Sequence, residues 1–103
     1  MDDVLESGRC AQLLKAIADP ERLRIVQCLR SGARNVSEIA DSLELEIANA
    51  SHHLGVLRQS GFVVADKQGR FVVYSLNPKI FVAKPSGKTP NRIELGCCRI
   101  ELP

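Results

Sequence analysis

The chain has 103 residues, of which 45% are hydrophobic and 25% are charged, and its formal net charge is +2. This length allows one domain with one modest core, and no apolar run approaches the roughly 18 residues that a membrane-spanning helix needs. Since 14 basic residues are balanced by 12 acidic ones, the chain has no strong overall positive field, and any binding of nucleic acid must depend on the local placement of charge.

The first three residues, Met-Asp-Asp, are acidic where a secretory signal peptide would be basic. We therefore expect a cytoplasmic protein without a membrane partner. In that compartment its four cysteines are expected to be reduced, and structural disulfides are not expected.

Two helices are predicted in the first third of the chain. Residues 4–18 carry apolar side chains at helical spacing. Asp19 and Pro20 then mark the start of a second helix, because Asp is a good N-cap and Pro suits the first helical position. Cys28 is interpreted as a small core residue. The side chains expected to line the buried side of this helix are Leu23, Ile25, Val26 and Leu29.

Residues 35–60 predict two short helices joined by a tight turn. Asn35 can cap the first helix, and Glu38 three residues later completes a capping box. The second helix is expected from about Ile47 to Gln59. Its buried stripe is expected to consist of Ile47, Ala50, Leu54 and Leu57. The opposite side is small and polar, as a helix in a DNA major groove should be, and comprises Ala48, Asn49, His52, Gly55, Val56 and Gln59.

An ordinary pair of amphipathic helices is the plainer interpretation of this stretch, but the next segment favours a helix-turn-helix. Residues 61–76 form two β-branched and aromatic runs around a turn at Gly69, which predicts a β-hairpin with Lys67 and Arg70 at its tip. The fold predicted for residues 1–78 is therefore a winged helix-turn-helix, mainly α with a β-hairpin wing (α+β).

Residues 79–103 are predicted to form a linker and a non-helical C-terminal tail of the same domain. Two prolines and a glycine within residues 84–90 predict an irregular linker. The sequence Arg-Ile-Glu-Leu then occurs at residue 92 and again at residue 99, on either side of two adjacent cysteines, so we expect a strand with a bulge or turn at that point. We expect the tail to pack on the domain or on a partner subunit, and the first helix and the tail to form a dimer interface.

Four segments, residues 16–26, 36–40, 51–63 and 69–76, resemble the ArsR/SmtB family of bacterial metal- and metalloid-responsive repressors. The resemblance implies a homodimeric winged helix that binds a palindromic operator in double-stranded DNA and leaves it when an inducer binds. Two half-sites a helical turn apart give a physical reason for the dimer, because they add affinity and sequence information together. The chain departs from the family pattern at Glu46, which is a poor N-cap for the recognition helix.

The candidate DNA contacts lie on that helix and on the wing. We assign base reading to Asn49 and His52, because both point away from the apolar stripe and both donate and accept hydrogen bonds. Val56 is a candidate contact for a thymine methyl group, and His53, at the border of the buried face, is expected to be packed and hydrogen-bonded. The expected contacts to phosphate or the minor groove are Ser51, Arg58, Lys67 and Arg70. For each residue alone, a solvated surface position is the competing interpretation.

Two sensor sites typical of the family are not predicted in this chain. Residues 79–103 contain no His for a zinc site on a C-terminal helix, and residues 35–38 contain no Cys for a thiolate site. The remaining candidate ligands are Cys97 and Cys98, with Cys10 as the third if the tail folds back on the first helix. Three thiolates suit arsenite, antimonite or a soft metal ion as inducer.

Other interpretations remain open. The cysteines are equally compatible with simple packing, an adventitious disulfide or the sensing of oxidants, and the switch could also be independent of them. In another class, the winged helix is a protein-interaction module that binds no DNA. An enzyme is not predicted, because the sequence shows no catalytic triad, no carboxylate pair in a pocket-forming context and no glycine-rich phosphate loop. No constitutive cofactor is expected.

Overall fold

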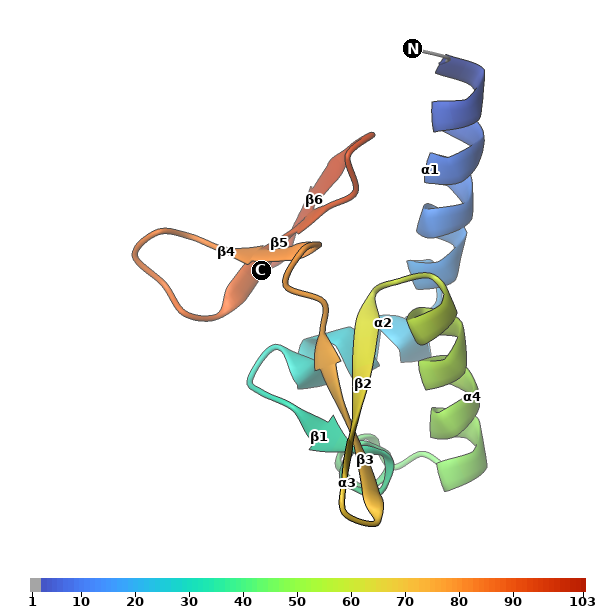
Figure 1. Ribbon diagram of the computed structural model, residues 1–103, viewed down its shortest axis with the longest axis vertical. Coiled ribbons are helices and arrows are strands. Elements are labelled where there is room, and N and C mark those ends of the chain that lie inside the picture. Colours follow the sequence, from blue (N-terminus) through green and yellow to red (C-terminus); the bar gives the residue numbers. More distant parts are fainter. Residues whose placement is uncertain (1–2) are drawn as a thin grey trace.

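The computed structural model describes the backbone of residues 3–103 and the side chains of residues 7–103. Met1 and Asp2, which contribute to the expectation about a signal peptide, lie outside the described residues. The described residues form four helices, α1 (Asp3–Ile17), α2 (Pro20–Leu29), α3 (Val36–Leu43) and α4 (Ile47–Gln59), and two three-stranded antiparallel sheets (Figure 1). This arrangement confirms the predicted winged helix-turn-helix. Within the described part of the chain, no helix has both the length and the apolar character to cross a bilayer.

Local side chains determine where two of the helices begin. Asp19 Oδ1 accepts hydrogen bonds from two backbone N–H groups in the first turn of α2, at 2.9 and 3.1 Å. At the start of α3 the capping box is complete, because Asn35 and Glu38 each accept a bond from the other's backbone N–H at 2.9 Å. Both caps were predicted. Glu46 precedes α4 without a side-chain cap bond, as expected for Glu at this position.

The wing is the hairpin of β2 (Val63–Gln68) and β3 (Phe71–Leu76). Its two-residue turn contains Gly69 with a φ of 63°, a left-handed conformation that favours glycine. A short strand that the pattern did not predict, β1 (Arg34–Asn35), pairs with the other edge of β3. This pairing ties the wing to the start of α3.

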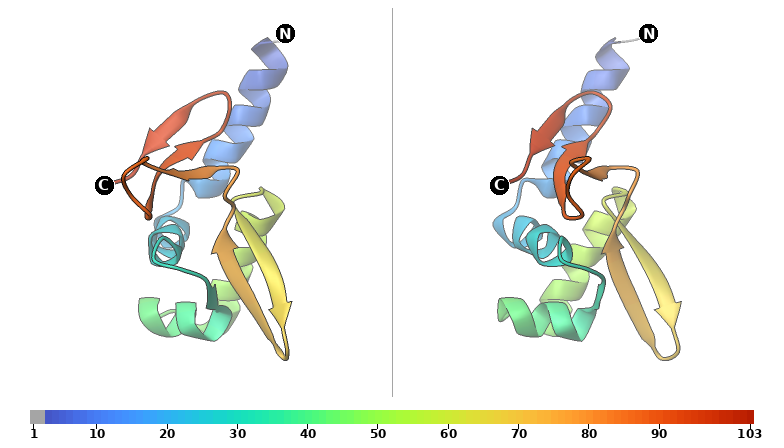
Figure 2. Two further views of the ribbon diagram at one scale, coloured as in Figure 1. Left: turned by 60° about the vertical axis from the view of Figure 1, so that its left-hand side comes forward. Right: turned by 90° about the vertical axis from the view of Figure 1, so that its left-hand side faces the viewer.

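The C-terminal tail forms a second antiparallel sheet instead of a helix. Its strands are β4 (Phe81–Ala83), β5 (Pro90–Glu94) and β6 (Arg99–Glu101), in the order β4-β5-β6. The β5–β6 turn contains the two adjacent cysteines and lies beside α1 (Figure 2). The predicted non-helical tail with a turn at the cysteines is therefore confirmed, whereas β4 and its pairing with β5 were not predicted.

One core joins the helices, the wing and the tail. Phe62, after α4, and Phe81 of the tail pack edge to face with ring centroids 6.3 Å apart, and Ile93 of β5 is fully buried. The buried residues of this core are Ala16, Ile17, Ile25, Val26, Leu29, Ile39, Leu54, Leu57, Phe62, Val63, Phe81 and Ile93. The tail therefore packs on the same core as the winged helix.

Three predictions of burial were wrong. Leu23 is 40% exposed, because it lies two residues before the fully buried Ile25 and residues two apart in a helix point to nearly opposite sides. Ile47 is 56% exposed because it is the first residue of α4, where no earlier turn covers it. Cys28 is half-buried and is not part of the core cluster.

Candidate functional site

The outward side of α4 carries the predicted DNA contacts. Asn49, Ser51, His52 and Arg58 are all exposed, so no described residue covers this face. Val56 differs from them, since it is half-buried and packs against the core. The helical period places His52 roughly opposite the buried residues of α4 and places Asn49, Ser51 and Arg58 on the flanks between them.

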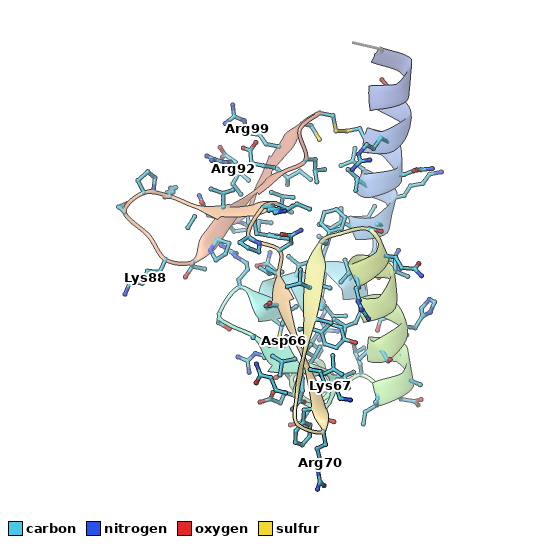
Figure 3. All side chains as sticks on the ribbon, viewed as in Figure 1. Asp66, Lys67, Arg70, Lys88, Arg92 and Arg99 are labelled. Carbon is cyan, nitrogen blue, oxygen red and sulfur yellow. A yellow bond between two sulfur atoms is a disulfide. The ribbon has the colours of Figure 1, made fainter. Side chains whose placement is uncertain are left out.

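The tip of the wing lies at the same end of the molecule as the start of α4 (Figures 1 and 2). Lys67 and Arg70 are exposed, and Arg70 extends from the tip of the hairpin away from the body (Figure 3). Phe71 and Val72 beside them are 52% and 40% exposed, which was not predicted. The wing therefore presents a basic tip with apolar side chains behind it.

A network of hydrogen bonds connects α2 to α4. His53 is only 7% exposed, and its ring lies between Glu21 and Arg22, at 3.3 Å and 3.2 Å. The second carboxylate oxygen of Glu21 accepts a bond from Nδ2 of Asn49 at 3.1 Å. The packed, hydrogen-bonded His53 was predicted. Glu21 and Arg22 were not, because partners that lie 28 to 32 residues away leave no local pattern.

The pKa of Asp19, the residue that caps α2, is lowered by its surroundings. The backbone hydrogen bond from Arg22 is the main reason why the pKa of the Asp19 carboxyl lies below its ordinary value of 3.8. The Arg22 guanidinium also stabilises the ionised form, while partial burial opposes it. The start of α2 is therefore held by a carboxylate that stays ionised to a lower pH than an ordinary Asp.

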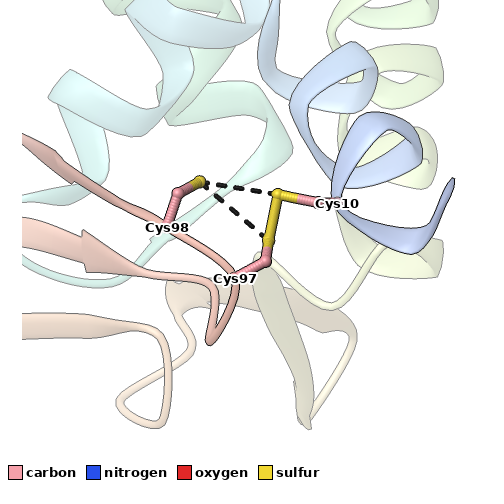
Figure 4. Close-up of a disulfide and its surroundings, with 3 residues drawn as sticks. All are labelled: Cys10, Cys97 and Cys98. Carbon is pink, nitrogen blue, oxygen red and sulfur yellow. Dashed lines mark hydrogen bonds between the residues drawn. A yellow bond between two sulfur atoms is a disulfide. The ribbon is translucent and has the colours of Figure 1, made fainter. Parts of the chain in front are cut away.

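The three predicted thiol ligands meet at one place. Cys10 on α1 and Cys97 in the β5–β6 turn are joined by a disulfide, and Cys98 Sγ lies 3.6 Å from Cys10 Sγ (Figure 4). All three sulfur atoms lie within 4.8 Å of one another. The expectation that disulfides do not form in this chain is wrong for this pair, because the tail folds back on α1 and brings the two cysteines into bonding distance.

The turn explains how neighbouring cysteines reach the same point. On an extended strand they would point to opposite faces. Here Gly96 adopts a φ of 86°, and the backbone N–H of Leu95 donates to the carbonyl of Cys98 at 2.9 Å, which closes the turn. In the described part of the chain, no other group of three or more Cys, His, Asp or Glu side chains converges in this way. A donor set made only of sulfur fits a thiophilic ion or metalloid.

Comparison with known proteins supports the architecture. A family model described as "Helix-turn-helix domain" matches residues 17–64. The chain is 42% identical over 74 residues to the HTH-type transcriptional regulator NmtR of Mycobacterium tuberculosis (strain ATCC 25618 / H37Rv). This match covers 72% of the chain and 62% of NmtR, so the chain spans less than two thirds of that relative.

Solved structures show the same fold. The homodimeric winged helix-turn-helix DNA-binding domain of Mb0332 from Mycobacterium bovis, described as a possible ArsR-family transcriptional regulator, matches with a TM-score of 0.70 and 28% identity, over 75% of this chain and 71% of that one. A possible transcriptional regulator for arsenical resistance matches with a TM-score of 0.63 and 38% identity, over 66% and 71%. All three proteins are named as regulators of transcription, two of them as possible ones. The chain belongs to the ArsR/SmtB family of winged helix-turn-helix transcriptional regulators.

Proposed function

We propose that this protein is a homodimeric transcriptional repressor that acts in the cytoplasm, binds operator DNA and is released by a thiophilic inducer. The observation that carries the DNA-binding part is the exposed polar side of α4, a helix whose first turn lies at the same end of the molecule as the tip of the wing. In such an arrangement α4 enters the major groove, with Asn49 and His52 at base edges. Ser51, Arg58, Lys67 and Arg70 then contact the backbone or the minor groove.

The inducer is proposed to be arsenite, antimonite or a soft metal ion, bound by Cys10, Cys97 and Cys98. The convergence of the three sulfur atoms supports this proposal. Two cellular thiols must first reduce the disulfide between Cys10 and Cys97 by two electrons, and they are themselves oxidised to a disulfide. Arsenous acid then exchanges its three hydroxyl groups for three thiol sulfur atoms, and each thiol proton leaves with a hydroxyl group as water. Because the ligands come from α1 and from the tail, the bound inducer fixes these two elements relative to each other.

The disulfide itself favours a second candidate, a repressor switched by oxidation. A hydroperoxide would take two electrons and two protons from Cys10 and Cys97, and would be reduced to water and an alcohol, or to two waters in the case of hydrogen peroxide. This switch uses two of the same three sulfur atoms and needs no metal or metalloid.

A gel-shift titration on the DNA upstream of the protein's own gene tests these proposals. The fully reduced parent should bind, and its affinity should fall steeply with salt, by roughly 10³-fold or more between about 50 and 200 mM if six or more phosphates are contacted. Arsenite should release the reduced parent but not Cys97→Ser/Cys98→Ser. Cys28→Ser, which removes a cysteine outside the cluster, is the matched control and should respond like the parent.

The outcomes separate the candidates. Release by peroxide and not by arsenite would establish the oxidation switch in place of the metalloid switch. If arsenite still releases the Cys97→Ser/Cys98→Ser variant from DNA, these cysteines are not the ligands of the inducer. Absence of salt-dependent binding to any DNA would leave the protein-interaction module as the remaining interpretation.

A further inference from the structure

A single carboxylate from α2 spans one turn of α4. Glu21 Oε1 lies 3.3 Å from Nε2 of His53, and Glu21 Oε2 accepts a hydrogen bond from Nδ2 of Asn49 at 3.1 Å. Asn49 and His53 are four residues apart, so they are neighbours on the same side of the helix. Asn49 is exposed and His53 is buried. Glu21 therefore connects a proposed base-contacting residue to a residue of the protein interior.

The protonation of His53 follows from its two partners. The Arg22 guanidinium has only donors, so Nδ1 of His53, 3.2 Å from Arg22 Nη1, must accept. Nε2 therefore carries the proton and donates to Glu21. The same guanidinium also donates to the backbone carbonyl of Ala16 at the end of α1. Glu21 is consequently held by a buried imidazole that is itself anchored to the body of the domain.

This arrangement fixes the orientation of the Asn49 amide. An ionised carboxylate only accepts hydrogen bonds, so the NH₂ end of the amide must face Glu21 and the oxygen must face the other way. One N–H of Asn49 is used by Glu21, while the second N–H and the oxygen bond to none of the residues that the structure describes. Asn pairs with adenine by one N–H to N7 and by its oxygen to the N6 amino group, so these free groups are the ones that adenine requires.

We propose that Glu21 is a positioning residue that sets the base preference of Asn49 and favours adenine at the base pair it reads. This inference rests on the proposed function, in which α4 enters the major groove. A negative side chain beside a DNA-binding helix repels phosphate, so Glu21 opposes binding in general. Glu21 contributes to base selectivity. Without Glu21 the side-chain amide of Asn49 can rotate by about 180°, so that its NH₂ group and its oxygen exchange places.

The experiment compares two substitutions that remove the same charge. Glu21→Gln keeps an acceptor oxygen at only one of the two positions that face Asn49 and His53 and places an NH₂ group, which cannot accept, at the other. Glu46→Gln is the matched control, because Glu46 also stands beside the start of α4 but makes no side-chain cap bond. Affinities are measured for operators changed one base pair at a time, with Asn49→Ala to identify the base pair that Asn49 reads.

At that base pair the parent should discriminate by about tenfold or more, as a bidentate contact does. Asn49→Ala and Glu21→Gln should both reduce the discrimination several-fold, whereas Glu46→Gln should keep it. Adding Glu21→Gln to Asn49→Ala should reduce it no further. Any general gain in affinity from the lost charge should appear in both Gln variants.

Unchanged discrimination in Glu21→Gln, or in Asn49→Ala, would overturn the inference. A parent that binds no DNA would instead overturn the proposed function. The contact itself is tested without DNA by the side-chain amide resonances of Asn49 in the free protein. These should shift in Glu21→Gln and not in Glu46→Gln, and an unshifted resonance would show that Glu21 does not hold the amide.

Discussion

Asp19 is the side chain through which pH acts on the start of α2. Its pKa is lowered mainly by the backbone hydrogen bond from Arg22, so the folded state favours the ionised form. A carboxylate of this kind stabilises the fold above its unfolded pKa, and the stabilisation is lost as the pH falls through the lower, folded pKa. Asn at this position can cap the helix but cannot titrate. We expect the free energy of unfolding of the parent to exceed that of Asp19→Asn near neutral pH, and the difference to shrink below about pH 4.

Urea titrations of both proteins between about pH 7 and pH 2 measure this difference. Asn35→Ala is a suitable control, because it removes a cap that does not titrate and should cost about 0.5–2 kcal/mol. A gap between the parent and Asp19→Asn that stays constant across the whole pH range would contradict the prediction.

Residues whose role depends only on their near neighbours along the chain were predictable from the sequence. The caps at Asp19 and Asn35 and the exposure of Asn49 and His52 follow from helical signals within a few residues. Glu21 was not identified as a partner of Asn49, because its contact depends on how α2 and α4 cross, and the spacing within either helix does not contain that information.

Among the elements, the wing was predictable and the tail sheet was only partly so. The wing has two β-branched runs and a glycine in its turn, and both signals are local. In the tail, β4 and β5 are joined across a segment rich in Pro and Gly, and their pairing is reinforced by the bond from the Glu94 N–H to the Ile80 carbonyl at 2.7 Å. That register is decided by the burial of Phe81 and Ile93, which the sequence alone does not show.

Because Ile93 of β5 is buried in the common core, we expect the tail to unfold together with the rest of the domain. Ile93 is fully buried in the core that also contains Phe62 and Leu57, so Ile93→Ala leaves a cavity and should lower the free energy of unfolding by about 2–5 kcal/mol. Val64→Ala, at a 41% exposed position of the wing, should cost less than about 1 kcal/mol. Denaturant titrations followed by circular dichroism measure both values. A tail that formed a separate unit would give a small loss for Ile93→Ala, or two transitions.

At the scale of the whole molecule, the two proposed activities depend on opposite ends of the fold. The wing tip and the start of α4 lie at one end, and the cysteine cluster joins α1 to the tail toward the other (Figures 1 and 3). An inducer bound to the cysteines is therefore remote from the DNA and must act through the relative positions of elements. A dimer interface on α1 would make the spacing of the two α4 helices sensitive to such a change.

The outer surface of α1 allows this interface to be tested. Leu14 is 37% exposed, Ala11 lies three residues before it on the same side of α1, and Ala18 follows directly after the helix; both alanines are also exposed. If a second copy covers this stripe, Leu14→Glu places a charge in an apolar contact, and the protein should sediment as a monomer with an unchanged far-UV circular dichroism spectrum. Its affinity for a two-half-site operator should fall, because each monomer binds one half-site alone. Val64→Glu, at a similarly exposed position on β2, should remain dimeric in sedimentation, and a Leu14→Glu protein that does the same would place the interface elsewhere.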